Sequence, residues 1–184
     1  NPLLFWDKPP SGVYDIWVGT FGESPAPATL YISELGEPGE SSGAGGEIGG
    51  GVDIFAAPSA GTMRLTGGFL PDPEQRNVTA GGPLSASSAV NAGCRGFITR
   101  EPTVELRYDG ASSLYIYTSG GADTTLAVNT PDGRWVCDDD GAAGVNAGLA
   151  FTNGARGTYD IYVGTYGSNR RTTTLNVSEL GMDR

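Results

Sequence analysis

The stretch GTYDIYVGTYG, residues 157–167, predicts a β-strand whose two faces have different characters. Side chains alternate between the two faces of a strand, so Tyr159, Ile161 and Val163 share one face. We expect this apolar face to enter a hydrophobic core. The opposite face carries Asp160, Tyr162 and Tyr166.

The same pattern occurs a second time near the start of the chain. Residues 12–36 align with residues 157–181 without a gap, at a constant offset of 145 (Tyr159 minus Tyr14), and fourteen positions are identical. Both segments close on the motif SELG. An ungapped match of this kind indicates an internal duplication, because shared composition would not preserve the spacing.

The two copies differ in how much of each is present. The second copy extends from about Thr62 to Leu180, whereas only the last third of the first copy is present, as residues 1–36. We expect a precursor that carried the whole first copy and was cleaved just before Asn1. Residues 37–61 are rich in glycine and poor in apolar residues, and they are interpreted as a linker. The predicted organisation is therefore a truncated repeat, a linker and a complete repeat at 62–184.

Short alternating segments separated by turn residues fill the complete copy. Eight strands are expected, at residues 96–99, 103–108, 113–119, 124–130, 134–138, 149–152, 158–166 and 173–180. Turns such as TPDG and DDDGAAG separate them. Many short strands between turn signals are typical of a β-sandwich or jelly roll. The predicted fold is an all-β, jelly-roll-like antiparallel β-sandwich, with an additional partial sandwich at the N-terminus.

Composition supports this fold class, and the charge and apolar runs of the chain argue against nucleic-acid binding and against a membrane-spanning helix. The chain has 30 Gly and 12 Pro, which favours many turns, and its net charge is −10. An acidic chain without a basic cluster repels a phosphate backbone, so nucleic-acid binding is not expected. No apolar run approaches the roughly 20 residues that a membrane-spanning helix needs.

The two cysteines are expected to form one structural disulfide. Cys94 and Cys137 lack the CxxC spacing of a zinc or redox site. A disulfide implies an oxidising compartment, which predicts a secreted, periplasmic or cell-surface protein.

Several of these motifs together resemble a known family. The run DTTLAVNTPDGRWVCDDD (123–140), followed by NAGLAF (146–151), GTYDIYVGTY and TLNVSEL (174–180), resembles the pre-peptidase C-terminal domain of secreted bacterial proteins. LPDPEQ (70–75) with Cys94 is similar to the opening of that module in proteobacterial proteins. The resemblance implies a β-sandwich that accompanies secreted hydrolases. Some members bind calcium or an extracellular polymer such as collagen.

Most enzyme chemistry is unavailable to this sequence. The chain contains no histidine, so Ser-His-Asp and Cys-His arrangements and His-ligated zinc are excluded. Hydrolysis by a carboxylate pair stays formally open. The aspartates, however, cluster in turns, where they commonly bond to their own backbone. A non-enzymatic role is therefore expected.

An acidic cluster is the candidate metal site. Its members lie at the ends of neighbouring predicted strands and are Asp123, Asp132, Asp138, Asp139 and Asp140. Ca²⁺ prefers six to eight oxygen ligands and would relieve the mutual repulsion of the carboxylates. The alternative is a solvated loop with Asx turns, in which no metal is bound.

A row of aromatic and acidic side chains is the candidate partner or ligand face. Asp160, Tyr162 and Tyr166 form it in the complete copy, and Asp15, Trp17 and Phe21 repeat it in the partial copy. Half-exposed aromatic rings could stack on a sugar or contact a protein partner. The alternative is that the row is buried and serves packing.

The truncated copy predicts an assembly. Residues 3–6, 13–21 and 28–35 would be strands with an apolar face and open edges, and such strands are not stable alone. Complementary strands could come from the cleaved upstream chain, from another copy of this protein or from a different subunit. The expected function is a structural or adhesive subunit of an extracytoplasmic assembly. The alternative is a calcium-dependent or aromatic-lined module that attaches a secreted hydrolase or cell surface to a polymer.

Overall fold

The computed structural model describes residues 16, 18–19 and 51–182 of the chain. The chain divides into two compact units, Asn1–Gly36 and Glu37–Arg184. In the first unit only Ile16, Val18 and Gly19 are described, and they carry no regular secondary structure. The other residues of the predicted partial sandwich, and residues 37–50 of the predicted linker, lie outside the described part.

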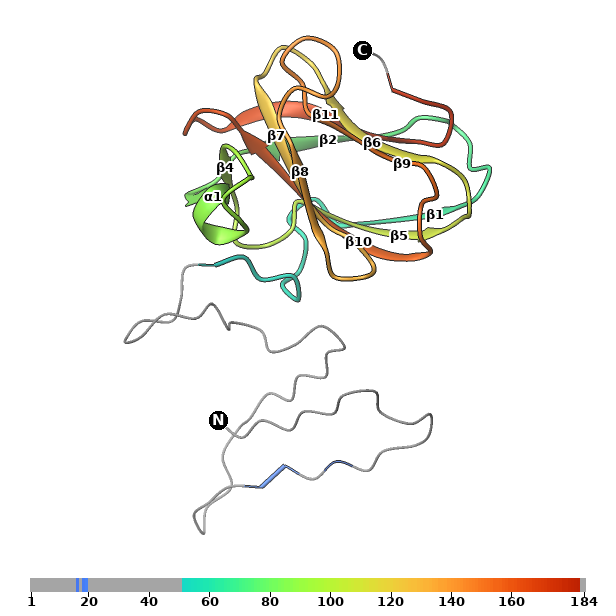
Figure 1. Cartoon of the computed structure of the whole chain (residues 1–184), viewed down its shortest axis with the longest axis horizontal. Coiled ribbons are helices and arrows are strands. Elements are labelled where there is room, and N and C mark those ends of the chain that lie inside the picture. Colours follow the sequence, from blue (N-terminus) through green and yellow to red (C-terminus); the bar gives the residue numbers. More distant parts are fainter. Residues whose placement is uncertain (1–15, 17, 20–50, 183–184) are drawn as a thin grey trace. The chain divides into compact units, whose positions relative to one another are not determined.

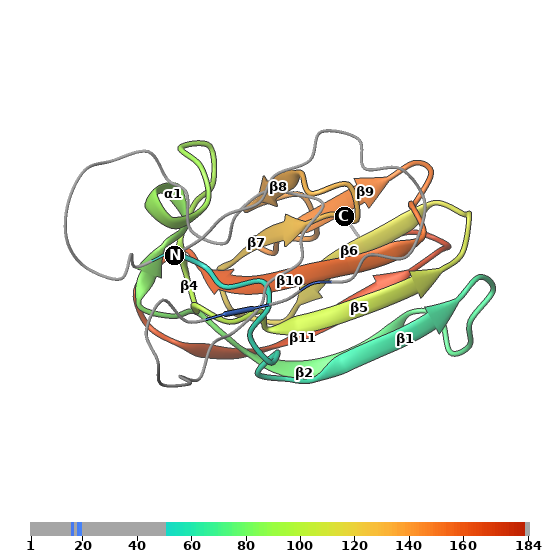
Figure 2. The same cartoon turned by 90° about the horizontal axis from the view of Figure 1, so that it is seen from below.

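The second unit is a two-layered, all-β domain (Figures 1 and 2). The seven-stranded sheet contains β1 (Thr62–Thr66), β3 (Leu84–Ser85), β4 (Phe97–Ile98), β5 (Val104–Asp109), β7 (Thr124–Asn129), β8 (Trp135–Asp138) and β10 (Gly157–Thr165). The four-stranded sheet contains β2 (Glu74–Ala80), β6 (Leu114–Ser119), β9 (Gly148–Phe151) and β11 (Arg171–Ser178). One short helix, α1 (Ala86–Ala89), lies beside β3 and β4 at one end of the domain. Within the described residues, no helix has the length and apolar character needed to cross a bilayer.

Strand β10 is the centre of the seven-stranded sheet. Its residues Gly157–Ile161 pair antiparallel with β5, and Thr165 pairs with β4 on the same edge. Its residues Asp160–Thr165 pair antiparallel with β7, which in turn pairs with β8. In the other sheet β11 holds the corresponding place, between β2 and β6. Both edges of both strands are thus occupied by neighbouring strands.

The structure confirms the all-β class and the two facing sheets, and it corrects one detail of the prediction. The sandwich was expected to be antiparallel, but β1 pairs with β5 in parallel, with Thr62 opposite Glu105 and Thr66 opposite Asp109. A parallel pair needs a long crossover connection. Here that connection runs through the other sheet, because β2 follows β1 directly along the chain.

All eight strands expected in the complete copy are present, and β1, β2, β3 and α1 are additional. The inner faces of the two sheets enclose one core, to which β10 contributes Tyr159, Ile161 and Val163, each no more than 1% exposed. This confirms the face predicted from the alternation. The other sheet supplies Val78, Leu114, Ile116, Leu175 and Val177.

A second, smaller core covers the outer face of β10. Its buried members are Ala86, Cys94, Ile98, Ala127 and Tyr162. Residues Val52 and Ile54 pack against it, and they lie in the described part of the predicted linker. The amides of Asp53, Ser59 and Ala60 donate to the carbonyls of Arg100, Pro102 and Thr103 at 2.7–2.9 Å. Residues 51–61 therefore pack onto the domain.

Candidate functional site

The predicted disulfide is present. Cys94, which follows α1, is bonded to Cys137 of β8, with an S–S distance of 2.02 Å and a Cα–Cα distance of 5.3 Å. The bond ties the α1 segment to the hairpin of β7 and β8 beside Tyr162, in the smaller core. A disulfide of this kind indicates an oxidising, extracytoplasmic compartment.

Asp138 closes the loop that follows β8. One of its carboxylate oxygens, Oδ2, accepts hydrogen bonds from the backbone amides of Gly141 (2.6 Å) and Gly148 (2.8 Å). A Cβ at Gly141 would overlap the carbonyl oxygen of Gly148, so this close approach requires glycine. Asp138 therefore organises the acidic loop through its own backbone, as the alternative interpretation of the cluster holds.

Asp132 lies at the opposite end of the β7–β8 hairpin, in the turn. Its carboxylate accepts from Thr130 Oγ1 (2.5 Å) and pairs with Arg134 Nε (2.7 Å). The hydrogen bond from Thr130 is the main reason that the pKa of Asp132 is lowered. Because the register places Asn129 opposite Trp135 and Leu126 opposite Asp138, the hairpin separates Asp132 from the Asp138 loop.

Asp123 precedes β7 and is at the same end of the hairpin as Asp138–Asp140. Its backbone carbonyl accepts from the amide of Tyr166 at 3.1 Å. Across residues 51–182, no three His, Cys, Asp or Glu side chains form a group that could hold a metal ion. The five aspartates are thus not brought together as one site, and calcium binding stays a prediction that this geometry does not support.

Asp160 is buried on the outer face of β10. It lies directly opposite Glu105 of β5 and Asn129 of β7, and it is 7% exposed. Burial, together with the nearby Glu105 carboxylate, raises the pKa of Asp160 to about 7. Glu105 itself pairs with Arg107 at 2.7 Å. The outer face of the sheet therefore contains a carboxyl group whose pKa lies near neutral pH.

Tyr162 is completely buried in the smaller core. Its ring packs against Trp135 with centroids 5.5 Å apart, and its hydroxyl has no hydrogen-bond partner among the described residues. Burial raises the pKa of the Tyr162 hydroxyl above its usual value. Tyr166, by contrast, is 53% exposed. Of the three residues that form the predicted ligand face in the complete copy, Asp160 and Tyr162 are therefore buried and Tyr166 is exposed. Their counterparts Asp15, Trp17 and Phe21 lie outside the described residues.

The carboxylate of Glu179, at the end of β11, accepts hydrogen bonds from two distant segments, and we call this arrangement the carboxylate clamp. The sequence alone did not predict it. Tyr108 donates its hydroxyl hydrogen to Glu179 at 2.5 Å, and the amide of Gly68 donates to the second oxygen of the same carboxylate at 2.6 Å. The amide of Glu179 donates to Asp72 Oδ2 at 2.9 Å. Burial and the bond to Glu179 raise the pKa of Tyr108 to about 12. The signal for this clamp was the SELG motif, which both copies retain.

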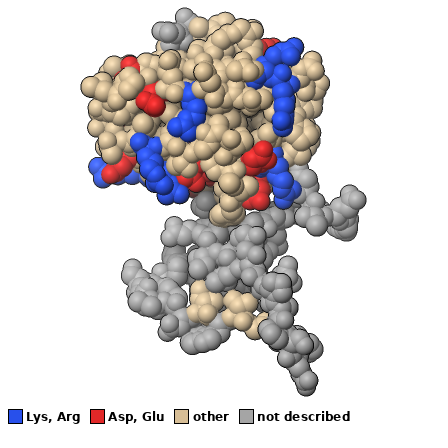
Figure 3. All heavy atoms as spheres, turned by 180° about the vertical axis from the view of Figure 1, so that it is seen from behind, with Lys and Arg blue, Asp and Glu red and all other residues tan. Residues whose placement is uncertain are grey.

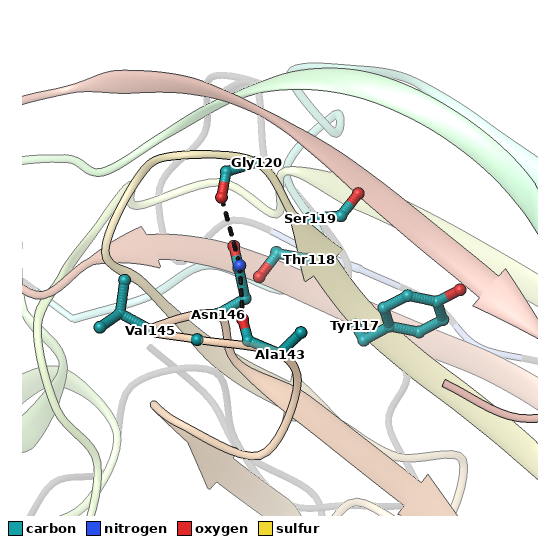
Figure 4. Close-up of a pocket in the computed structure, with 8 residues that line it drawn as sticks. Tyr117, Thr118, Ser119, Gly120, Ala143, Val145 and Asn146 are labelled. Carbon is teal, nitrogen blue, oxygen red and sulfur yellow. Dashed lines mark hydrogen bonds between the residues drawn. The ribbon is translucent and has the colours of Figure 1, made fainter. Parts of the chain in front are cut away.

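A shallow concavity of about 450 Å³ lies between the β6–β7 loop and the loop before β9 (Figure 4). Its lining carries no charged side chain. Asn146 crosses it, and its Nδ2 donates to the carbonyls of Gly120 (3.3 Å) and Ala143 (2.8 Å). These bonds tie the two loops together through the Nδ2 of Asn146, whereas its Oδ1 is buried without a hydrogen-bond partner among the described residues.

Charged side chains of both signs are interspersed on the face of the domain shown in Figure 3. Two of the ion pairs among the described residues, Arg156–Asp109 at 3.2 Å and Arg134–Asp132 at 2.7 Å, are exposed, and exposed pairs contribute little to stability. This face thus offers no concentrated charge for a ligand of either sign.

Comparisons of the chain with protein-family models, with curated proteins and with solved structures found no match. The resemblance to the pre-peptidase C-terminal domain therefore remains a prediction from the sequence.

Proposed function

We propose that this chain is a non-enzymatic, extracytoplasmic structural or adhesive subunit, in which another polypeptide completes the partial sandwich of residues 1–36. The complete repeat is then a jelly-roll-like module that is stable by itself. The disulfide supports an extracytoplasmic setting, and the resemblance to secreted bacterial modules favours the cell surface, the periplasm or the medium.

One contrast carries this proposal. Ile161 and Val163 are 0% and 1% exposed, whereas their counterparts Ile16 and Val18 are 46% and 57% exposed. The side chains are identical, and burying a Val or Ile side chain fully stabilises a fold by about 1.5–3 kcal/mol. Residues 16 and 18 thus retain the side chains of a core strand while they are exposed. A partner that covers them would recover that stabilisation.

The partner has three candidate sources: an upstream chain separated by cleavage, another copy of this protein, or a different subunit. Sedimentation velocity of the native protein, followed by a denaturing gel, distinguishes them. We expect a complex that is larger than one chain. A monomer without a second polypeptide would refute the proposal, and so would a longer single chain that supplies the missing strands itself.

A matched pair of variants links the complex to the exposed residues. Val18→Asp should abolish association, because a carboxylate cannot enter an apolar interface without a large penalty. Val145→Asp is the control, since Val145 is also exposed (48%) but belongs to a loop of the complete domain. If both variants assemble as the wild type does, residues 16–18 do not form the interface.

A further inference from the structure

We infer that a row of oxygen-bearing side chains on the outer face of the seven-stranded sheet is a binding site for one hard divalent cation. The row consists of Glu105 of β5, Asp160 of β10 and Asn129 of β7. It shares no residue with the acidic cluster predicted from the sequence. It also lies wholly within residues 51–182, so it does not depend on the proposed assembly.

The pairing register brings the three side chains of this row together. Asp160 lies directly opposite Glu105 on one side and directly opposite Asn129 on the other. Directly opposite residues of an antiparallel pair share a face of the sheet, with Cβ atoms about 4.5–5.5 Å apart. That face is the outer one, because Ile161, the next residue of β10, is buried in the core between the sheets. Oxygen ligands from three neighbouring strands are therefore within reach of one ion beside Asp160.

Two members of the row are buried without a hydrogen-bond partner. Asp160 and Asn129 are 7% and 5% exposed, and neither side chain forms a hydrogen bond or an ion pair within the described part of the chain. Their polar atoms still keep a small exposed area, so a small ion can reach them from solvent. Buried polar groups are normally hydrogen-bonded. A carboxyl and an amide that lie side by side without partners point to a ligand that both contact.

The hydroxyl of Tyr162 is a third unsatisfied group beside the row. Tyr162 follows Asp160 by two positions on the same face, and its buried hydroxyl has no hydrogen-bond partner among the described residues. Burial raises the pKa of this hydroxyl, and the charges of Asp160, Asp53 and Glu101 raise it further. These groups therefore interact electrostatically without touching, and the negative potential between them favours a cation.

No basic side chain of residues 51–182 pairs with Asp160. Arg107 binds Oε1 of Glu105 at 2.7 Å, and Thr62 Oγ1 donates to the same oxygen at 3.3 Å. Oε2 of Glu105 faces no such partner in the described part of the chain. Burial and the Glu105 carboxylate raise the pKa of Asp160 to about 7. Two carboxylates side by side repel each other, and a bound cation would remove that repulsion.

The donor set indicates the class of ion. Carboxylate and amide oxygens are ligands of Ca²⁺ and Mg²⁺, which are hard cations. The row has two carboxylates, which is compatible with the finding that residues 51–182 contain no group of three His, Cys, Asp or Glu able to hold a metal. Water would supply the remaining ligands. So few protein ligands correspond to weak binding, with a dissociation constant on the order of 0.1–1 mM.

The test is a series of thermal melts of the full chain in chelator-treated buffer at pH 8, before and after addition of Ca²⁺ or Mg²⁺. For a dissociation constant of about 1 mM, about 10 mM of the ion should raise the melting temperature of the wild type by about 3–5 °C. Sodium chloride at the same ionic strength should not. Asp160→Asn should lose the shift, because it removes the buried charge from the row.

Two further variants make the test specific. Asp139→Asn/Asp140→Asn is the matched control, because it removes two carboxylates from the loop after β8 and leaves the row intact. It should keep the full shift. Glu105→Gln retains an oxygen for Arg107 and Thr62, so it should fold, and it should reduce the shift by at least half.

Terbium luminescence gives an independent readout of where the ion binds. Trp135 of β8 lies directly opposite Asn129, so excitation of its ring should sensitise Tb³⁺ that occupies the row. Trp135→Phe should reduce this emission by more than half. Full emission from Trp135→Phe would place the ion away from the row and overturn the inference.

The melts have equally clear contrary outcomes. A wild type that neither ion stabilises would overturn the inference, since water alone would then fill the space beside Asp160. A shift that persists in Asp160→Asn, or one that the loop variant loses, would place the ion elsewhere and also overturn it. If Asp160→Asn does not fold, Glu105→Gln decides: an undiminished shift overturns the inference.

Discussion

Residues 16, 18 and 19 have the same identities as residues 161, 163 and 164, yet the surroundings of the two sets differ. In β10, Ile161 and Val163 are buried, and Gly164 lies against β7 and β4. In the first unit, Ile16 and Val18 are about half exposed, and no atom of a described residue lies within 4 Å of the Cβ position of Gly19. The comparison teaches that an alternating apolar pattern favours a strand with one buried face. Whether that face is buried depends on the neighbouring strands.

The largest expected effect comes from a charge at the centre of this comparison. Ile161→Asp would bury an unpaired carboxylate between the two sheets and should unfold the domain, with a loss of at least about 4 kcal/mol. Ile16→Asp should leave the thermal unfolding of residues 51–182 unchanged. Circular dichroism melts of the two variants check this. Equal destabilisation would mean that Ile16 and Ile161 contribute to the same core.

Removal of the disulfide should produce the next largest effect. Cys94 and Cys137 are 43 positions apart, and a loop of this size predicts a loss of about 2–4 kcal/mol in Cys94→Ser/Cys137→Ser. Urea unfolding of the variant and the wild type measures it. Reductant should weaken the wild type only. An unchanged wild type in reductant would show that the smaller core does not depend on the bond.

Gly164 and its counterpart Gly19 extend the comparison to the space around a single Cβ position. Gly164→Val should destabilise the domain by about 1–3 kcal/mol, because the added side chain meets Thr125 and the Phe97 carbonyl. Gly19→Val in the isolated chain should have no effect on the same thermal melt. If Gly19→Val also lowers the melting temperature, residue 19 contacts the folded domain, and the two environments are not distinct.

Much of the fold could be predicted from local pattern, because the alternation in strands such as β10 and β11 is clear. Strand β2 was missed because its outward residues Gln75, Asn77 and Thr79 are polar and only Val78 and Ala80 are buried. The parallel pairing of β1 with β5 joins segments that are distant in sequence, and no local pattern encodes it. Register between distant strands is decided by tertiary contacts.

The candidate site was harder to predict than the fold. Alternation correctly assigned Tyr162 to the face opposite Ile161, but it does not say whether that face meets water. Residues such as Val52 and Ala86 cover it, and they come from stretches without a periodic apolar pattern. The role of Glu179 likewise depends on Tyr108, which is 71 positions away. Contacts between distant segments, not residue types, decided both outcomes.

The smallest expected effect is a dependence of stability on pH that comes from Asp160 of β10. The pKa of Asp160 is raised from 3.8 to about 7 in the folded protein, so the folded state holds its proton more tightly than the unfolded state does. The stabilisation from that proton is fully present below about pH 4 and is lost as the pH rises towards 7.

Asp160→Asn should therefore raise the melting temperature by a few degrees at pH 8 and change it little at pH 4. Asp140→Asn, on an exposed loop, is the matched control and should show no such dependence. A gain from Asp160→Asn that is equal at both pH values would show that the buried charge is not its cause.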